Sequence, residues 1–127
     1  MKFICRIDLS LYRCISEDIT TDVVLVTEER IAHSNRHQRA FDRYGSFLRA
    51  ALTAPDYIIE DKRPNTGLVV KKVEAEDGRS LLIVLRVHVS GDPAGYKNSI
   101  ISCWDIGEAR LKNYLRNRKI LYKSHDS

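Results

Sequence analysis

Short apolar runs alternate with polar segments along the chain, and their spacing predicts helices before residue 54. Val23–Val26 is an unbroken apolar run that forms a short buried strand or leads into a helix. Thr27 has the character of a helix N-cap, and the two glutamates after it suit the positive end of a helix. From 38 to 53 apolar residues recur at helical spacing, which predicts a second helix with one apolar face.

After Pro55 the pattern changes to strands. Four segments carry it: 56–61, 68–75, 80–89 and 98–106. Asp77-Gly78 is a hairpin signal between the second and the third. A short basic helix and a closing edge strand at 119–123 follow. Helices first and antiparallel strands afterwards predict an α+β fold, with N-terminal helices packed on a four-stranded antiparallel sheet.

The first eighteen residues fit this scheme less closely. Segments 2–7 and 11–15 each read as extended, which predicts an arm or a hairpin over 1–18. The chain has 127 residues and shows no internal repeat, low-complexity tract or linker. We therefore expect a single domain over 1–127.

Alternation along the third predicted strand separates a core face from a second face. Leu82, Val84, Arg86 and His88 share the second face, so the sheet turns an arginine and a histidine away from the main core. In the fourth strand the same reasoning puts Ser99 on the side of the arginine, and a β-bulge would replace it with Ser102.

Composition and cysteine usage narrow the class of protein. Hydrophobic residues make up 43% and charged residues 30%, as in ordinary soluble domains, and no apolar stretch approaches the roughly 18 residues of a membrane span. Arg6 and Asp8 interrupt the run that a signal peptide needs. Cys5, Cys14 and Cys103 are odd in number and lack a CxxC spacing, which disfavours disulfides and a zinc cage. We expect a cytoplasmic protein without membrane contact.

The positive charge is concentrated at the C-terminal end. Residues 108–127 hold six lysines and arginines and two acids, so they account for the whole formal net charge of +4. A basic end on a neutral body indicates an anionic partner, most commonly nucleic acid. The alternative is a solvated helix whose basic end complements the helix dipole.

The stretch "IAHSNRH" places His33 and His37 one helical turn apart, with Arg36 beside the second. As metal ligands they lack a third and a fourth partner, and no HExxH motif is present. They are otherwise solvated surface residues or an acid/base pair, because imidazole both accepts and returns a proton near neutral pH.

Chemistry on RNA would use these side chains together. A base removes the proton from the 2′-hydroxyl, the oxygen attacks phosphorus, a cation stabilises the phosphorane, and an acid protonates the leaving 5′-oxygen. The nucleophile belongs to the substrate, so we expect neither a metal nor a cofactor. Suitable residue types occur at 33–37, 86–88 and 97–99. Lys97 follows a glycine-containing loop, and its alternative role is that of an exposed loop lysine.

Several stretches, taken in order, resemble one family. They are "ITTDVVLVTEERIAHSNRH", "PDYIIEDKRPNTGLVVKKVE", "LLIVLRV", "GDPAGYKNSIIS" and "KILYK". Together, from about Ile19 to Lys123, they resemble the phage-associated group of the barnase–EndoU–colicin–RelE-like (BECR) nucleases. The resemblance implies two N-terminal helices on a four-stranded antiparallel sheet and metal-independent endoribonuclease activity. It also implies a toxin or a phage or mobile-element protein, with RNA as substrate and a protein inhibitor (an antitoxin or immunity protein) as partner.

Carried over residue by residue, the resemblance gives the expected site. The catalytic group is His33, Arg36, His37, Arg86, Lys97 and Ser99. The substrate contacts carried over in this way are Asn65, Thr66, Asn98, Tyr122 and Lys123. The positive charge of the C-terminal segment adds Arg116 and Lys119 as contacts to the RNA backbone. The histidines would act as general base and acid, and the arginines would contact phosphate. Gln38 departs from the family pattern, where proline commonly follows the second histidine.

Two other functions remain open at this point. The same fold can serve as a non-catalytic RNA- or protein-binding module, such as a phage accessory protein. A metal hydrolase is the third alternative. Cleavage of RNA in the presence of a chelator distinguishes the first function from both.

Overall fold

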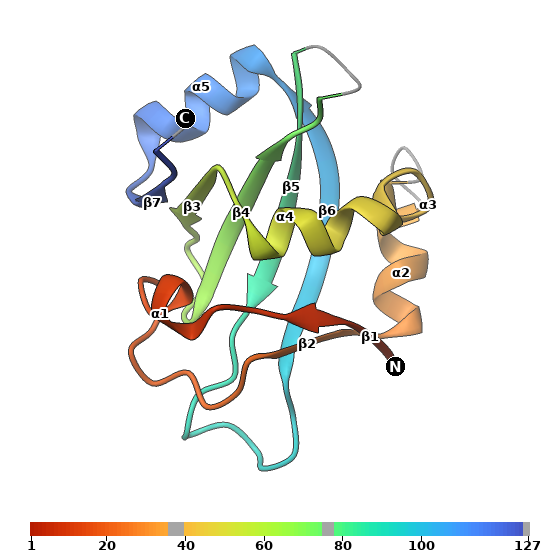
Figure 1. The fold of residues 1–127 in the computed structure, drawn as a ribbon, viewed down its shortest axis with the longest axis vertical. Helices are drawn as coiled ribbons and strands as arrows, with labels where there is room; N and C mark the ends of the chain where they lie inside the picture. The colour runs from red at the N-terminus through yellow and green to blue at the C-terminus, as the bar shows by residue number, and fades with distance from the viewer. Residues whose placement is uncertain (36–39, 75–77, 126–127) are drawn as a thin grey trace.

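A seven-stranded mixed sheet forms the centre of the protein in a computed structural model that describes residues 1–35, 40–74 and 78–125 (Figure 1). The strands are β1 (Lys2–Arg6), β2 (Val23–Val26), β3 (Tyr57–Glu60), β4 (Thr66–Lys72), β5 (Arg79–Arg86), β6 (Asn98–Gly107) and β7 (Ile120–Lys123). Their spatial order is β1-β2-β6-β5-β4-β3-β7. The pair β2–β6 is parallel, and every other neighbouring pair is antiparallel.

Helices lie on both faces and at one side of this sheet. They are α1 (Leu9–Tyr12), α2 (Glu28–Asn35), α3 (Ala40–Tyr44), the 3₁₀ turn η1 (Gly45–Phe47), α4 (Leu48–Thr53) and α5 (Glu108–Asn117). Figure 1 shows α4 crossing the sheet, and α2 and α3 beside β6. No helix in the described part of the chain combines the length and the apolar character that a bilayer crossing requires.

Local sequence signals explain where these elements begin and end. The hydroxyl Oγ1 of Thr27 accepts a hydrogen bond from the backbone N–H of Arg30 at 3.1 Å, so the predicted N-cap of α2 is confirmed. The Asp8 carboxylate caps α1 in the same way, through the backbone N–H of Ser10 at 2.9 Å. Helix α4 ends shortly before Pro55, as predicted.

The α+β class is confirmed, but the expected four-stranded antiparallel sheet is wrong. Strands β1, β2 and β7 extend the predicted four to seven, and β2 joins β6 in parallel. A parallel pair needs a long crossover connection, and a short apolar run does not encode which distant strand it will join. Segment 11–15 is also not extended, because α1 occupies residues 9–12. The single helix predicted over 38–53 is divided into α3, η1 and α4 in its described part.

The sheet is buried on both faces, by two separate apolar clusters. The larger one lies under α1 and α4 and includes Leu48, Leu52 and Leu85. The smaller one lies under α5 and includes Leu82 and Val84. The face of β5 that the sequence placed opposite the main core is therefore also buried, by the smaller apolar cluster. Strands buried on both faces read as continuous apolar runs, which is why alternation alone did not reveal the second cluster.

A β-bulge in β6 decides which of its residues face α5. The partner of Val84 is Ser102, but the partner of Leu85 is Ile100. The pairing therefore passes over Ile101, which is the extra residue of the bulge. Directly paired residues share a face of the sheet. Ser99, paired with Arg86, and Ser102 therefore lie on the same face although they are three residues apart. The sequence offered these two serines as alternatives, and the bulge brings both to that face.

Asp105 joins α3 to the sheet through ion pairs. Its Oδ2 accepts a hydrogen bond from the Tyr44 hydroxyl at 2.9 Å and lies 3.1 Å from Nη2 of Arg79 and 3.5 Å from Nη1 of Arg43. The side chain of Asp105 is only 2% exposed. Burial opposes its ionisation, but the Tyr44 hydrogen bond and the two guanidinium groups hold the pKa of Asp105 below its usual value. The carboxylate therefore stabilises the folded chain in its charged form.

Replacing Asp105 with asparagine should destabilise the fold by about 1–3 kcal/mol at pH 7, because the charged hydrogen bonds are lost. The pKa of Asp105 is lower in the folded chain than its unfolded value of about 3.8, so its charge stabilises the fold above that pH. This contribution is lost as the pH falls through the folded pKa. The difference between the wild type and Asp105→Asn should therefore shrink below pH 4. Urea unfolding at pH 7 and pH 3 measures it, with the exposed Glu17→Gln as control. A difference independent of pH would contradict the ionic role.

Gly67 is required by packing inside β4. A Cβ at this position would lie 2.6 Å from Cδ1 of Ile15 and 3.3 Å from Cγ2 of Ile58, which is buried. We expect Gly67→Ala to lower the free energy of unfolding by about 1–3 kcal/mol, because the core must shift to admit the methyl group. Gly91→Ala is the matched control, since nothing lies within 4 Å of its added Cβ. Equal stability of the two variants in urea unfolding would show that the core around β4 yields freely.

Candidate functional site

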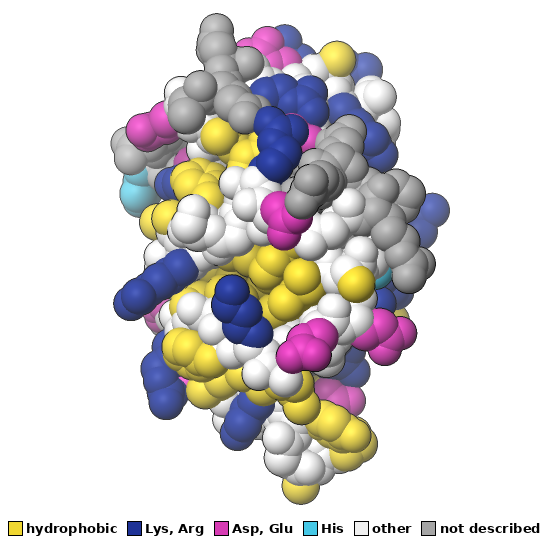
Figure 2. Space-filling view, turned by 90° about the vertical axis from the view of Figure 1, so that its right-hand side faces the viewer, with side chains coloured by type: hydrophobic (Ala, Val, Ile, Leu, Met, Phe, Trp, Pro, Cys, Tyr) yellow, Lys and Arg dark blue, Asp and Glu magenta, His cyan; other side chains and the backbone are white. Residues whose placement is uncertain are grey.

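The side of the molecule that carries α2 and α3 mixes apolar and charged groups (Figure 2). Hydrophobic side chains gather across its middle, and basic and acidic side chains surround them. Among the described residues, Met1 and Phe3 are large hydrophobic side chains with exposures of 77% and 55%. Positive charge is therefore not continuous over this side.

A cavity of about 350 Å³ lies at the open edge of β6. Its lining, which we call the His33 pocket, consists of His33, Ser34, Ser102, Cys103, Trp104, Asp105 and Arg110. Strand β2 pairs with β6 only at Asn98 and Ser99, so the rest of this edge is covered by α2 instead of a strand. Residues from α2, β6 and the start of α5 meet there.

The His33 pocket holds the side-chain types that acid/base chemistry on a phosphate needs. His33, which is exposed on α2, contributes an imidazole, and Arg110 contributes a guanidinium. Cys103 is an unsuitable nucleophile, because burial raises the pKa of its thiol to about 11. At neutral pH this leaves the imidazole as the group in the pocket suited to proton transfer.

The same pocket contains buried polar atoms without partners. In the described part of the chain, the buried side-chain atoms that lack a hydrogen-bond partner are Ser34 Oγ, Trp104 Nε1 and Asp105 Oδ1. All three belong to residues of the His33 pocket. Such atoms are uncommon in folded proteins, and their concentration here distinguishes this edge of the sheet from the rest of the core.

A second cluster of predicted residues lies at the end of β5, on the α5-facing side of the sheet. Thr66, Arg86 and Ser99 are direct neighbours across three strands. The Arg86 guanidinium forms a two-point ion pair with Asp92, at 2.8 and 2.9 Å, and also donates to the carbonyl of Val87. A phosphate would have to compete with the Asp92 carboxylate for this arginine.

This cluster and the His33 pocket lie close together along the sheet. Ser102 lines the pocket and pairs with Val84, two residues before Arg86 on the same face. Two residues of a strand span about 7 Å. Lys97 precedes this part of β6 in an exposed loop, and Ser99 is half-buried, with its hydroxyl 3.4 Å from the Lys97 carbonyl. The bulge in β6 places Ser102 of the His33 pocket on the same face as this cluster.

Three predicted substrate contacts have polar groups that the fold itself uses. Asn98 is fully buried, accepting from the backbone N–H of His88 and donating to the carbonyl of Thr21. Asn65 has a positive φ of 54°, and its carbonyl accepts the backbone N–H of Val87. Thr66 is buried and donates to the carbonyl of Pro64. These contacts hold the strand ends in place.

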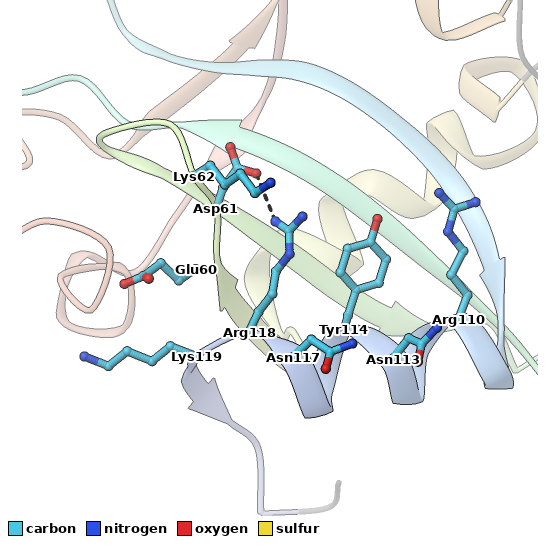
Figure 3. Close-up of a pocket in the computed structure, with 9 residues that line it drawn as sticks. All are labelled: Glu60, Asp61, Lys62, Arg110, Asn113, Tyr114, Asn117, Arg118 and Lys119. Atoms are coloured by element: carbon cyan, nitrogen blue, oxygen red, sulfur yellow. Dashed lines mark hydrogen bonds and ion pairs between the residues drawn. The ribbon is translucent and has the colours of Figure 1, made fainter.

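A larger groove of about 600 Å³ runs beside α5 (Figure 3). Its lining, which we call the α5 groove, consists of Glu60, Asp61, Lys62, Arg110, Asn113, Tyr114, Asn117, Arg118 and Lys119. These residues come from α5 and the segment after it, and from the end of β3 and the turn that follows. Arg110 lines both the α5 groove and the His33 pocket, so the two cavities adjoin.

The predicted C-terminal contacts are distributed over different surfaces. Lys119 lines the α5 groove, whereas Arg116 does not. Tyr122 pairs with Ile58, a member of the larger cluster, so its side chain faces away from α5. Lys123 is exposed on the edge strand β7.

Arg36 and His37 lie outside the described residues. No group of three or more histidine, cysteine, aspartate or glutamate side chains gathers in the described part of the chain in a way that would hold a metal ion.

Sequence reasoning did not identify several residues of the two cavities. They are Lys62, Trp104, Arg110, Asn113, Tyr114, Asn117 and Arg118. The positions 110, 113, 114 and 117 follow helical spacing, which was a usable signal for one face of α5. The turn that forms the opposite wall of the groove lies about fifty residues earlier in the chain, and no local pattern indicates that the two meet.

Comparison with known proteins identifies a family. A family model described as phage-Barnase-EndoU-ColicinE5/D-RelE like nuclease2 (PBECR2) matches residues 8–123. No curated protein and no solved structure matches the chain.

Proposed function

Because the chain belongs to the PBECR2 family of phage barnase–EndoU–colicin E5/D–RelE-like nucleases, we propose that it is a metal-independent endoribonuclease. The observation that carries the proposal is the His33 pocket. An imidazole and a guanidinium line one cavity there, and the cavity adjoins a groove rich in cations. This combination suits an enzyme that holds a phosphodiester and transfers protons on either side of it.

The reaction proceeds by attack of the substrate's own 2′-hydroxyl. A histidine takes the proton of that hydroxyl, the oxygen attacks the adjacent phosphorus, and a second acid protonates the leaving 5′-oxygen. We assign one of these steps to His33 and the other to His37, with Arg36 as a phosphate contact. Arg110 adds a contact that the sequence did not suggest, since it lines the same pocket as His33. Positive charge beside the phosphorane stabilises the transition state.

The cluster at the end of β5 contacts the same strand of RNA in this proposal. Arg86 exchanges its ion pair with Asp92 for a phosphate, and Lys97, in the exposed loop two residues before Ser99, adds a second cation. Ser99 completes the cluster as the cross-strand neighbour of Arg86. These groups lie about 7 Å along the strand from the serine that lines the His33 pocket, a spacing compatible with contacts to the same RNA strand.

The remaining predicted contacts have secondary roles. Asn65, Thr66 and Asn98 hold the strand ends that carry the phosphate-binding groups. The basic C-terminal segment, including Arg116, Lys119, Tyr122 and Lys123, adds attraction for the RNA backbone that weakens with salt. A toxin-like ribonuclease of this kind often needs a protein inhibitor in the cell that makes it, so we propose an antitoxin or immunity protein as a partner.

Cleavage of total RNA in excess EDTA tests the proposal. We expect His33→Ala to lower the cleavage rate by about 10²–10⁴-fold, because general acid–base catalysis contributes that much. His125→Ala is the matched control, since it removes an exposed histidine near the C-terminus that the proposal does not use. The products should carry 2′,3′-cyclic phosphate ends, and a 2′-O-methyl RNA should remain intact.

Other results would reject this function. Loss of cleavage on chelation would indicate a metal hydrolase. Binding of RNA without cleavage by the wild type would indicate a non-catalytic module. Equal activity of His33→Ala and the wild type would remove His33 from the chemistry.

A further inference from the structure

We propose that the α5 groove is a binding subsite for single-stranded RNA, which places nucleotides adjacent to the cleaved phosphate along α5. The inference rests on the proposed function for the nature of its ligand. It goes further because it assigns RNA binding to the α5 groove and RNA cleavage to the His33 pocket, two cavities that share Arg110.

The charge of the groove favours a polyanion. Four cations, Lys62, Arg110, Arg118 and Lys119, line it together with the carboxylates of Glu60 and Asp61. Asp61 is already engaged, at 2.7 Å from Nε of Arg63 and 3.4 Å from Nη1 of Arg118, with its side chain 9% exposed. Burial opposes its ionisation, but hydrogen bonds from Arg63 hold the pKa of Asp61 below its usual value. Asp61 therefore positions its arginine partners and adds little repulsion.

The groove face of α5 presents groups suited to nucleotides. Arg110, Asn113, Tyr114 and Asn117 follow one another at helical spacing, whereas Leu111 is buried against the sheet. The eight helical residues from 110 to 117 span about 12 Å, which is long enough for more than one nucleotide. The asparagine amides both donate and accept hydrogen bonds, so they suit bases and sugars as well as phosphates.

A flat arginine–tyrosine pair lies in the middle of the groove, with the Tyr114 ring half-buried against the smaller apolar cluster. The Arg118 guanidinium lies over the ring of Tyr114, at 5.3 Å from the ring centroid. Figure 3 shows Arg118 beside the Tyr114 ring, with Lys62 and Asp61 on one side and Arg110 at the other end. Proteins that bind single strands combine a positively charged groove with flat surfaces on which bases stack. A duplex keeps its bases stacked inside and leaves such a surface unused.

The groove leads directly to the proposed chemistry. Arg110 stands at the boundary, since it lines both cavities, and Trp104 and His33 lie beyond it in the His33 pocket. A strand bound on α5 would therefore meet Arg110 at the border of the His33 pocket. The α5 groove begins at the turn after β3, the His33 pocket ends at α2, and the two cavities share Arg110.

Variants that each remove one positive charge distinguish RNA binding in the groove from general attraction to the positive C-terminal segment. Lys62→Gln removes an exposed cation from the groove, and Arg118→Gln removes the cation of the arginine–tyrosine pair. Lys112→Gln is the control, because Lys112 is exposed on α5 and is not part of the groove lining. Lys62 carries no part of the Asp61 ion pairs, so its variant tests the groove even if Arg118→Gln proves less stable.

Binding is measured by fluorescence anisotropy with a labelled 12-nucleotide 2′-O-methyl RNA of mixed sequence, which cannot be cleaved by 2′-hydroxyl attack. We expect Lys62→Gln and Arg118→Gln to raise the Kd about three- to tenfold and to reduce the salt dependence of binding, because each removes a phosphate contact. Lys112→Gln should change the Kd by less than twofold. A duplex of the same sequence should bind more weakly than the single strand.

Kinetics give a second readout. With a cleavable 12-nucleotide RNA, the groove variants should raise KM and leave kcat unchanged. With a dinucleotide, which is too short to occupy the groove, they should match the wild type. Equal weakening by all three variants, equal binding of duplex, or an equal effect on the dinucleotide would overturn the inference.

The two proposals fail in different ways. If the wild type binds the 2′-O-methyl RNA through the groove but cleaves no RNA, the endoribonuclease proposal fails and the subsite remains. If RNA is cleaved but the groove variants bind the probe like the wild type, the subsite is wrong and the proposed function remains. If the wild type does not bind the probe, the inference is rejected whatever the activity.

Discussion

The antiparallel pairing of β5 with β6 is the interaction on which the rest of the candidate site depends. It fixes the register that sets Arg86 beside Ser99, and its bulge adds Ser102 to the same face. A shift of one residue would turn each of these side chains to the opposite face of the sheet. Strand β6 also receives β2 at one end and leads into α5 at the other, so its register positions both cavities.

A buried carboxylate secures the helices over that strand. Asp105 projects from β6 toward α3, where the Tyr44 hydroxyl donates a hydrogen bond to its Oδ2. The guanidinium of Arg79, from β5, forms an ion pair with the same oxygen. Helix α3 packs against α2, and α2 carries His33. By holding α3, and with it α2, against the edge of the sheet, the ion pairs of Asp105 indirectly fix the position of the His33 imidazole. Such a group has a structural role even though its residue lines the pocket.

The two faces of the sheet have different tasks. One face packs against α1 and α4 in the larger apolar cluster and makes the fold stable. The other is only partly covered, by α5, and leaves the end of β5 and the flank of the helix accessible to ligands. Helix α5 buries Leu111 and turns Arg110 and Asn117 toward the groove. An amphipathic helix of this kind completes a core and forms a binding surface with the same ten residues.

The sequence by itself determined the α+β class, most of the elements, the N-cap at Thr27 and the concentration of positive charge after residue 107, because these depend on neighbours within a few positions. It also pointed to the nuclease family, which a family model confirms over 8–123. Only the tertiary structure decided that β2 joins β6 in parallel and that Arg110 belongs to both cavities. Such facts arise from contacts between segments tens of residues apart. Helical and strand periodicities record which face of an element is apolar, and they do not record which other element that face will meet.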